Sequence, residues 1–138
     1  MEYQSVHTEE EIMGIFDKLK KKDANYGTDD FPSIMQANKV DGIGKSKDGN
    51  KLVLLIIDVL NWEEENEHLV FLQEKINAYI GFIECKQYIE TYPDDIFDGY
   101  IIQISFMHEM SKKCKQFLEV ASNQVQNLNI IIMVEIGG

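Results

Sequence analysis

The feature that most constrains the fold is a short, uninterrupted apolar run, Leu52–Ile57. Continuous and partly β-branched, it is typical of a central strand that is covered on both faces. The turn sequence Lys47-Asp48-Gly49-Asn50 precedes it, and its Asp-Gly pair favours a tight hairpin. We therefore predict a hairpin with strands over 39–45 and 51–58. The run is far shorter than the ~20 residues that a membrane-spanning helix needs.

Downstream of this hairpin, the hydrophobic pattern switches between helical and extended periods. Apolar residues three and four apart predict helices over 62–86 and 108–126. Alternating residues predict a half-exposed strand over 100–106, and the apolar segment Ile130–Ile136 predicts a last strand. Tyr88–Tyr92 is interpreted as a short extended piece.

A further amphipathic helix is predicted at 8–22, and the loop residues after it are interpreted as a linker. The element order is then α-ββαβαβ. Because crossovers between parallel strands are right-handed, the two later helices should cover one face of the sheet. We expect an α+β fold, a two-layer sandwich with a mixed sheet of about four strands and two helices on one face. The chain divides into an accessory N-terminal helix and linker, 1–37, and one α+β domain, 38–138.

The charge balance argues against several classes of partner. The chain has 24 acidic residues against 13 basic ones, all of them lysine, for a net charge of −11. Nucleic acids and anionic membranes need positive surface, and arginine supplies the commonest specific base contact. We therefore expect neither nucleic acid nor membrane as a partner. The N-terminus lacks the basic and apolar layout of a signal peptide, which predicts a cytoplasmic protein.

Several short strings resemble a family of small bacterial proteins of unknown function that occur as short stand-alone chains. The strings are Val40-Asp41-Gly42-Ile43-Gly44, Lys51–Asp58, Leu60-Asn61-Trp62, Glu67-His68-Leu69, Leu72–Tyr79 and Phe82-Ile83-Glu84. Members of that family often carry Asp-His-Leu-Asp-Trp where this chain has Val59 and Asn61 in place of the His and the second Asp. The resemblance covers about 39–136 and implies a fold without established chemistry.

No known catalytic motif is present, because the chain lacks a Gly-rich phosphate loop and a Gly-x-Ser-x-Gly turn. Two cysteines are too few for a thiolate zinc site, and Cys114 falls on the apolar stripe of a predicted helix. We therefore assign no catalytic residue, no metal site and no cofactor. The alternative is a small metal-dependent or acid–base enzyme that uses Asp41, Asp58 and His68, with Glu67 beside them.

Residues 61–98 combine acidic and aromatic side chains, with ten acidic residues against two lysines. Acidic charge raises the association rate with a basic partner, and aromatic side chains anchor an interface. We predict a non-enzymatic protein-binding module, such as an inhibitor or immunity-type antidote of a basic protein. The predicted interface residues are Trp62, Tyr88, Tyr92, Asp94 and Asp95.

A third hypothesis is a homo-oligomeric module, with a homodimer as its simplest form. The helix predicted over 62–86 is broadly apolar, and the strand predicted over 100–106 is half-polar. Either that helix or the open face of the sheet could pair across a two-fold axis. This hypothesis is compatible with a binding role.

Overall fold

The computed structural model describes residues 32–137, so the helix predicted at 8–22 lies outside the described residues. The strands and helices in chain order are β1 (Gly42–Lys45), β2 (Lys51–Asp58), α2 (Glu65–Glu84), β3 (Gly99–Phe106), α3 (Lys112–Val125) and β4 (Ile130–Ile136). Three short 3-10 helices accompany them, namely η3 (Ser33–Met35), η4 (Gln87–Glu90) and η5 (Gln126–Leu128). The order of strands and helices confirms the α+β prediction for this part of the chain.

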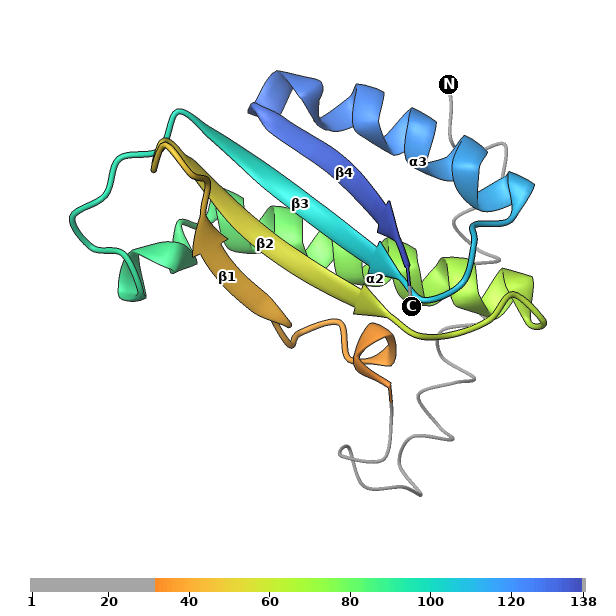
Figure 1. Ribbon diagram of the computed structural model, residues 1–138. Helices are drawn as coiled ribbons and strands as arrows, with labels where there is room; N and C mark the ends of the chain where they lie inside the picture. Colours follow the sequence, from red (N-terminus) through yellow and green to blue (C-terminus); the bar gives the residue numbers. More distant parts are fainter. Residues whose placement is uncertain (1–31, 138) are drawn as a thin grey trace.

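The four strands form one mixed sheet in the order β1-β2-β3-β4. β1 is antiparallel to β2, whereas β2, β3 and β4 are parallel to one another. In Figure 1 the sheet faces the viewer and α2 lies behind it. Phe117 of α3 belongs to the same buried cluster as Ile76 of α2 and Ile104 of β3, so both helices lie on the same side of the sheet. The predicted two-layer architecture is therefore confirmed.

The β1–β2 hairpin closes through the predicted turn. Gly49 has a φ of +77°, a conformation that glycine adopts without strain. The Asp48 carboxylate accepts hydrogen bonds from the Ser46 hydroxyl at 2.7 Å and from the Asn50 backbone N–H at 3.0 Å. These local bonds explain why the boundaries of β2 could be predicted from the sequence alone.

Four local predictions differ from the structure. β1 begins at Gly42 rather than at 39. α2 begins at Glu65 rather than at 62, because the Asn61 side chain accepts from the Glu63 N–H and forms a turn before the helix. α3 begins at Lys112 rather than at 108, where the Ser111 hydroxyl caps it by accepting from the Cys114 N–H. The segment predicted to be extended at 88–92 contains η4 instead.

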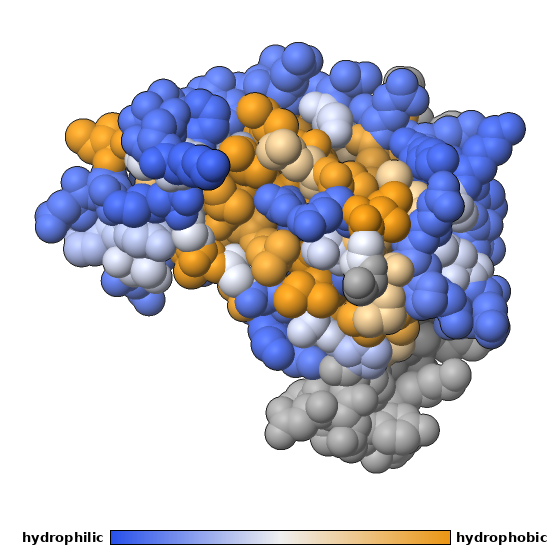
Figure 2. All heavy atoms as spheres, in the orientation of Figure 1, coloured by the Kyte–Doolittle hydropathy of each residue, from blue (hydrophilic) through white to orange (hydrophobic). Residues whose placement is uncertain are grey.

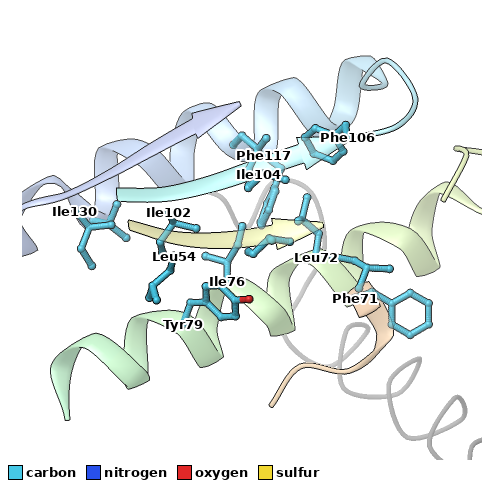
Figure 3. Close-up of a cluster of buried hydrophobic side chains, with 14 of the residues drawn as sticks. Leu54, Phe71, Leu72, Ile76, Tyr79, Ile102, Ile104, Phe106, Phe117 and Ile130 are labelled. Atoms are coloured by element: carbon cyan, nitrogen blue, oxygen red, sulfur yellow. The ribbon is translucent and has the colours of Figure 1, made fainter. Parts of the chain in front are cut away.

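The core lies between the sheet and the two helices. Figure 3 shows Leu54, Ile102 and Ile104 pointing from the strands toward Leu72 and Ile76 of α2. The remaining fully buried aliphatic positions include Leu52, Ile56 and Ile34. Ile34 belongs to η3, so the packed unit includes residues that the sequence interpretation placed in the linker.

Candidate functional site

A buried polar cluster lies at the carboxyl end of β2. The Nε2 atom of His68 is 2.6 Å from the Asp58 carboxylate, and both side chains are at most 1% exposed. The Nδ1 atom is 3.0 Å from the Asn61 carbonyl oxygen. Because a carbonyl oxygen only accepts, we assign a proton to Nδ1. The second oxygen of Asp58 accepts from the Leu60 N–H at 3.1 Å, so the carboxylate has a partner on each oxygen.

The ring of Trp62 stacks on the ring of His68, with the centroids 3.6 Å apart. Its Nε1 atom is buried without a hydrogen-bond partner among residues 32–137. Stacking on His68 and tilted packing on Phe106 therefore fix the position of this ring. Trp62 helps to seal the Asp58–His68 pair from water.

A second polar cluster ties the segment before β1 to α2. The Lys75 ammonium donates to the Ser33 and Gln36 carbonyl oxygens and to the Asp41 carboxylate, at 2.6, 3.0 and 3.1 Å. The other Asp41 oxygen accepts from the Ile57 N–H at 2.8 Å. Burial lowers the pKa of the Lys75 ammonium, and the neighbouring Asp41 carboxylate opposes that shift.

Tyr79 completes this cluster. Its hydroxyl donates to the Leu55 carbonyl oxygen at 2.6 Å and accepts from the Asp41 N–H at 2.8 Å. Burial raises the pKa of the Tyr79 hydroxyl well above its ordinary value. One side chain of α2 therefore satisfies backbone groups at the start of β1 and on β2.

Asp41, Asp58 and His68, the residues of the alternative enzyme hypothesis, all lie in these two buried clusters. Each oxygen of the Asp41 and Asp58 carboxylates has an internal partner, and both side chains are at most 1% exposed. His68 borders a surface hollow of about 260 Å³, but only 1% of its side chain is exposed. Within the described residues, no group of three or more His, Cys, Asp or Glu side chains could hold a metal ion. These contacts give both clusters a structural role.

The two cysteines have different surroundings. Cys114 is fully buried, as its place on the apolar stripe of α3 predicted, whereas Cys85 is exposed. Burial, together with the nearby Asp58 and Glu65 carboxylates, raises the pKa of the Cys114 thiol to about 12. A protonated thiol without access to solvent is a poor nucleophile.

The structure divides the five predicted interface residues between the two ends of α2. Trp62 precedes the helix, and the other four follow it; a helix of 20 residues is about 30 Å long. Tyr88 is buried, its hydroxyl lies 3.1 Å from that of Tyr100, and burial raises the pKa of Tyr88 to about 12. Tyr92 is half-buried against Phe97.

The acidic loop between η4 and β3 carries the other two predicted interface residues. Asp94 is exposed, and Asp95 forms an ion pair with Lys45 of β1 at 3.4 Å. Between Asp95 and the exposed Asp98 lies Ile96, whose side chain is 92% exposed. The loop thus presents one large apolar side chain among carboxylates.

The opposite side of the sheet carries a surface that the five predicted interface residues do not include, although the homo-oligomer hypothesis named it. We define the open face by six apolar side chains that point away from the helices: Val53, Leu55, Ile57, Ile101, Ile131 and Met133. Figure 2 shows apolar residues gathered over the sheet on this side. The exposed fractions of Ile57, Ile131 and Met133 are 39%, 49% and 48%. The expectation that both faces of β2 are covered is therefore not met within residues 32–137.

β1 adds Gly42 and Gly44, which have no side chains, to the open face. A Cβ atom on Gly42 would lie 3.3 Å from two side-chain atoms of Leu55, so the absent side chain leaves room for Leu55 to lie against β1. Val59 and Met107, directly after β2 and β3, continue the same alternation and are 38% and 49% exposed. The apolar surface therefore extends past the carboxyl ends of the strands.

Comparisons with known proteins identify the family of this chain. None of the helices within residues 32–137 has the length and apolarity to cross a membrane. No curated protein and no solved structure matches the chain significantly. Residues 32–137, which hold the whole sheet and both polar clusters, match a family of unknown function. The chain therefore belongs to the family DUF6572, whose function is unknown.

Proposed function

We propose that this chain is a non-enzymatic protein-binding module and that the open face is its binding surface. The observation that carries the proposal is the exposure of large apolar side chains on the outer side of the sheet, with Ile57, Ile131 and Met133 at 39–49%. An extended apolar patch on a folded domain is typical of a protein-interaction site. Burial of this surface against a partner would lower the free energy, because it removes apolar side chains from water.

The type of sheet supports the same proposal. Parallel strands are normally covered on both faces, and their sequences are then continuously apolar. β2, β3 and β4 are parallel, and β2 has the continuous apolar sequence, yet the described helices cover one face. A protein layer on the open face would complete the arrangement that such strands normally have.

The proposal can be tested by capture from an extract of the native cells with the tagged full-length chain as bait. Ile131→Lys would place a charge on the open face, whereas Ile89→Lys changes a similarly exposed residue on η4. We expect wild type and Ile89→Lys to retain a protein, either another chain or the untagged copy, that Ile131→Lys loses. Retention that is unaffected by Ile131→Lys and Met133→Lys would overturn the proposal.

The acidic loop offers a second candidate surface, for a basic partner of an inhibitor or immunity-type protein. The exposure of Ile96 among Asp94, Asp95 and Asp98 favours it, because an exposed apolar anchor and surrounding charge together suit such a partner. We expect capture that weakens with salt and that Ile96→Ser abolishes while Ile131→Lys leaves it intact. Salt-independent capture would contradict this candidate.

A further inference from the structure

We infer that the partner on the open face is a second copy of this chain, packed sheet against sheet across a two-fold axis. This inference rests on the proposed function and names the occupant of the same surface. Two sheets that pack face to face interdigitate their inner side chains and form a core about 10 Å thick. A two-fold axis in the interface makes the same apolar patch meet itself.

The size of the face suits this partner. Four strands about 4.8 Å apart and up to eight residues long, at about 3.3 Å per residue, span up to about 19 Å by 26 Å. Each copy would then bury up to about 500 Å², and the pair up to about 1,000 Å², the size at which a specific interface begins. The exposed Val59 and Met107 would add to this area.

A single helix is a poorer match for the same face. The helix predicted at 8–22 would be about 22 Å long and about 10–12 Å wide, so it would cover about half of the area estimated above. Two helices, α2 and α3, cover the inner face of this sheet. A face of this size therefore needs two helices to be fully covered. A second sheet has the matching width.

The polarity of the face also favours a like surface over a charged partner. Across the sheet, Val53, Ile101 and Ile131 form one wholly apolar row in register. Gln103, an uncharged residue, lies in register between Leu55 and Met133, and its amide donates to the Glu135 carboxylate near the carboxyl end of β4 at 2.7 Å. At the amino end Lys51 pairs with Asp98 at 3.0 Å. Charges at the two ends, each with an internal partner, leave an uncharged centre for a second copy.

Sedimentation equilibrium of the full-length chain tests the inference, with Ile131→Lys, Met133→Lys and the control Ile89→Lys alongside wild type. Circular dichroism of each variant checks that it is folded. We expect a dimer for wild type and for Ile89→Lys. Each lysine on the open face should raise the dissociation constant by roughly tenfold or more, because it places a charge in an apolar interface.

The other outcomes separate the inference from the proposed function. A monomer at concentrations up to about 1 mM, together with capture that depends on Ile131, overturns the inference and leaves the proposed function standing. A monomer without such capture overturns both. A dimer that withstands both Ile131→Lys and Met133→Lys overturns the inference, because its interface lies elsewhere.

A further variant tests the N-terminal segment as the occupant. Phe16 is an apolar residue of the helix predicted at 8–22. If that helix covers the open face, wild type is a monomer, and Phe16→Asp exposes the face and increases the binding of a hydrophobic dye. This result would overturn the inference. A dimer that Phe16→Asp leaves unchanged is the result expected for a second copy.

Discussion

At the scale of single residues, four buried ionisable side chains form two pairs that hold the fold together. Asp58, His68, Asp41 and Lys75 have their side chains at most 1% exposed, and each has internal hydrogen-bond partners. A buried polar group costs free energy unless it is paired, and loss of one partner leaves the other uncompensated. The internal pairing of these residues therefore contributes to the stability of the fold.

Replacement of Asp58 by alanine should destabilise the fold by about 3–5 kcal/mol, because it leaves the His68 imidazole buried without its carboxylate. Urea unfolding followed by fluorescence of the single Trp62 would measure this loss. Asp98→Ala is the matched control, since it breaks the exposed Lys51–Asp98 pair and should cost less than about 1 kcal/mol. A similar small cost for Asp58→Ala would contradict the structural role.

The two thiols should differ sharply in reactivity. In a Cys85→Ser variant, labelling of Cys114 at pH 8 requires the protein to open, so it should be roughly a thousandfold slower than labelling of Cys85 in a Cys114→Ser variant. Timed labelling with a thiol reagent measures both rates. Comparable rates in the folded protein would show that Cys114 is accessible.

The Cys114 thiol predicts how the stability of the fold changes with pH. Its folded-state pKa of about 12 lies above its ordinary value of 9.0. Between these values the unfolded chain releases the proton while the folded chain keeps it. The contribution of Cys114 to stability is therefore complete below pH 9 and is lost as the pH rises toward 12.

At the scale of elements, Tyr79 joins three parts of the fold. A Tyr79→Phe variant would leave the Asp41 N–H and the Leu55 carbonyl without this partner, at a cost of about 1–3 kcal/mol. Hydrogen exchange should quicken first in β1, whose entry Tyr79 holds. Tyr88→Phe removes a hydroxyl that contacts another hydroxyl and should cost less. Equal effects of both variants would contradict this assignment.

The strands that were predicted correctly are those whose boundaries depend on neighbouring residues in the sequence. β2 and β4 have the predicted boundaries, because hydrophobic period and turn residues decide them locally. The starts of α2 and α3 were misplaced, since the side chains of Asn61 and Ser111 decide where each helix begins. Whether Tyr88 belonged to the core or to a surface depended on Tyr100, twelve residues away.

At the scale of the whole molecule, the net charge of −11 gives the proposed dimer a distinctive salt response. Two acidic copies repel each other, and salt screens that repulsion over about 10 Å at 0.1 M. The dimer should therefore tighten as sodium chloride is raised, and sedimentation equilibrium at several salt concentrations would show it. Binding of a basic partner at the acidic loop should weaken over the same range. A dimer that weakens with salt would contradict an apolar interface.

By itself, the sequence determined the main strands and helices within residues 32–137, their order and the net negative charge of this protein. These properties follow from hydrophobic period, turn chemistry and charge count, all of which act over a few residues or over the whole composition. Only the tertiary structure decided that Asp58 meets His68 and that Asp41 meets Lys75. It also decided that the outer side of β2 stays uncovered by the described helices. The burial of a side chain depends on which residues pack against it in the folded structure. The hydrophobic pattern of the sequence shows only which side chains are apolar and favour burial.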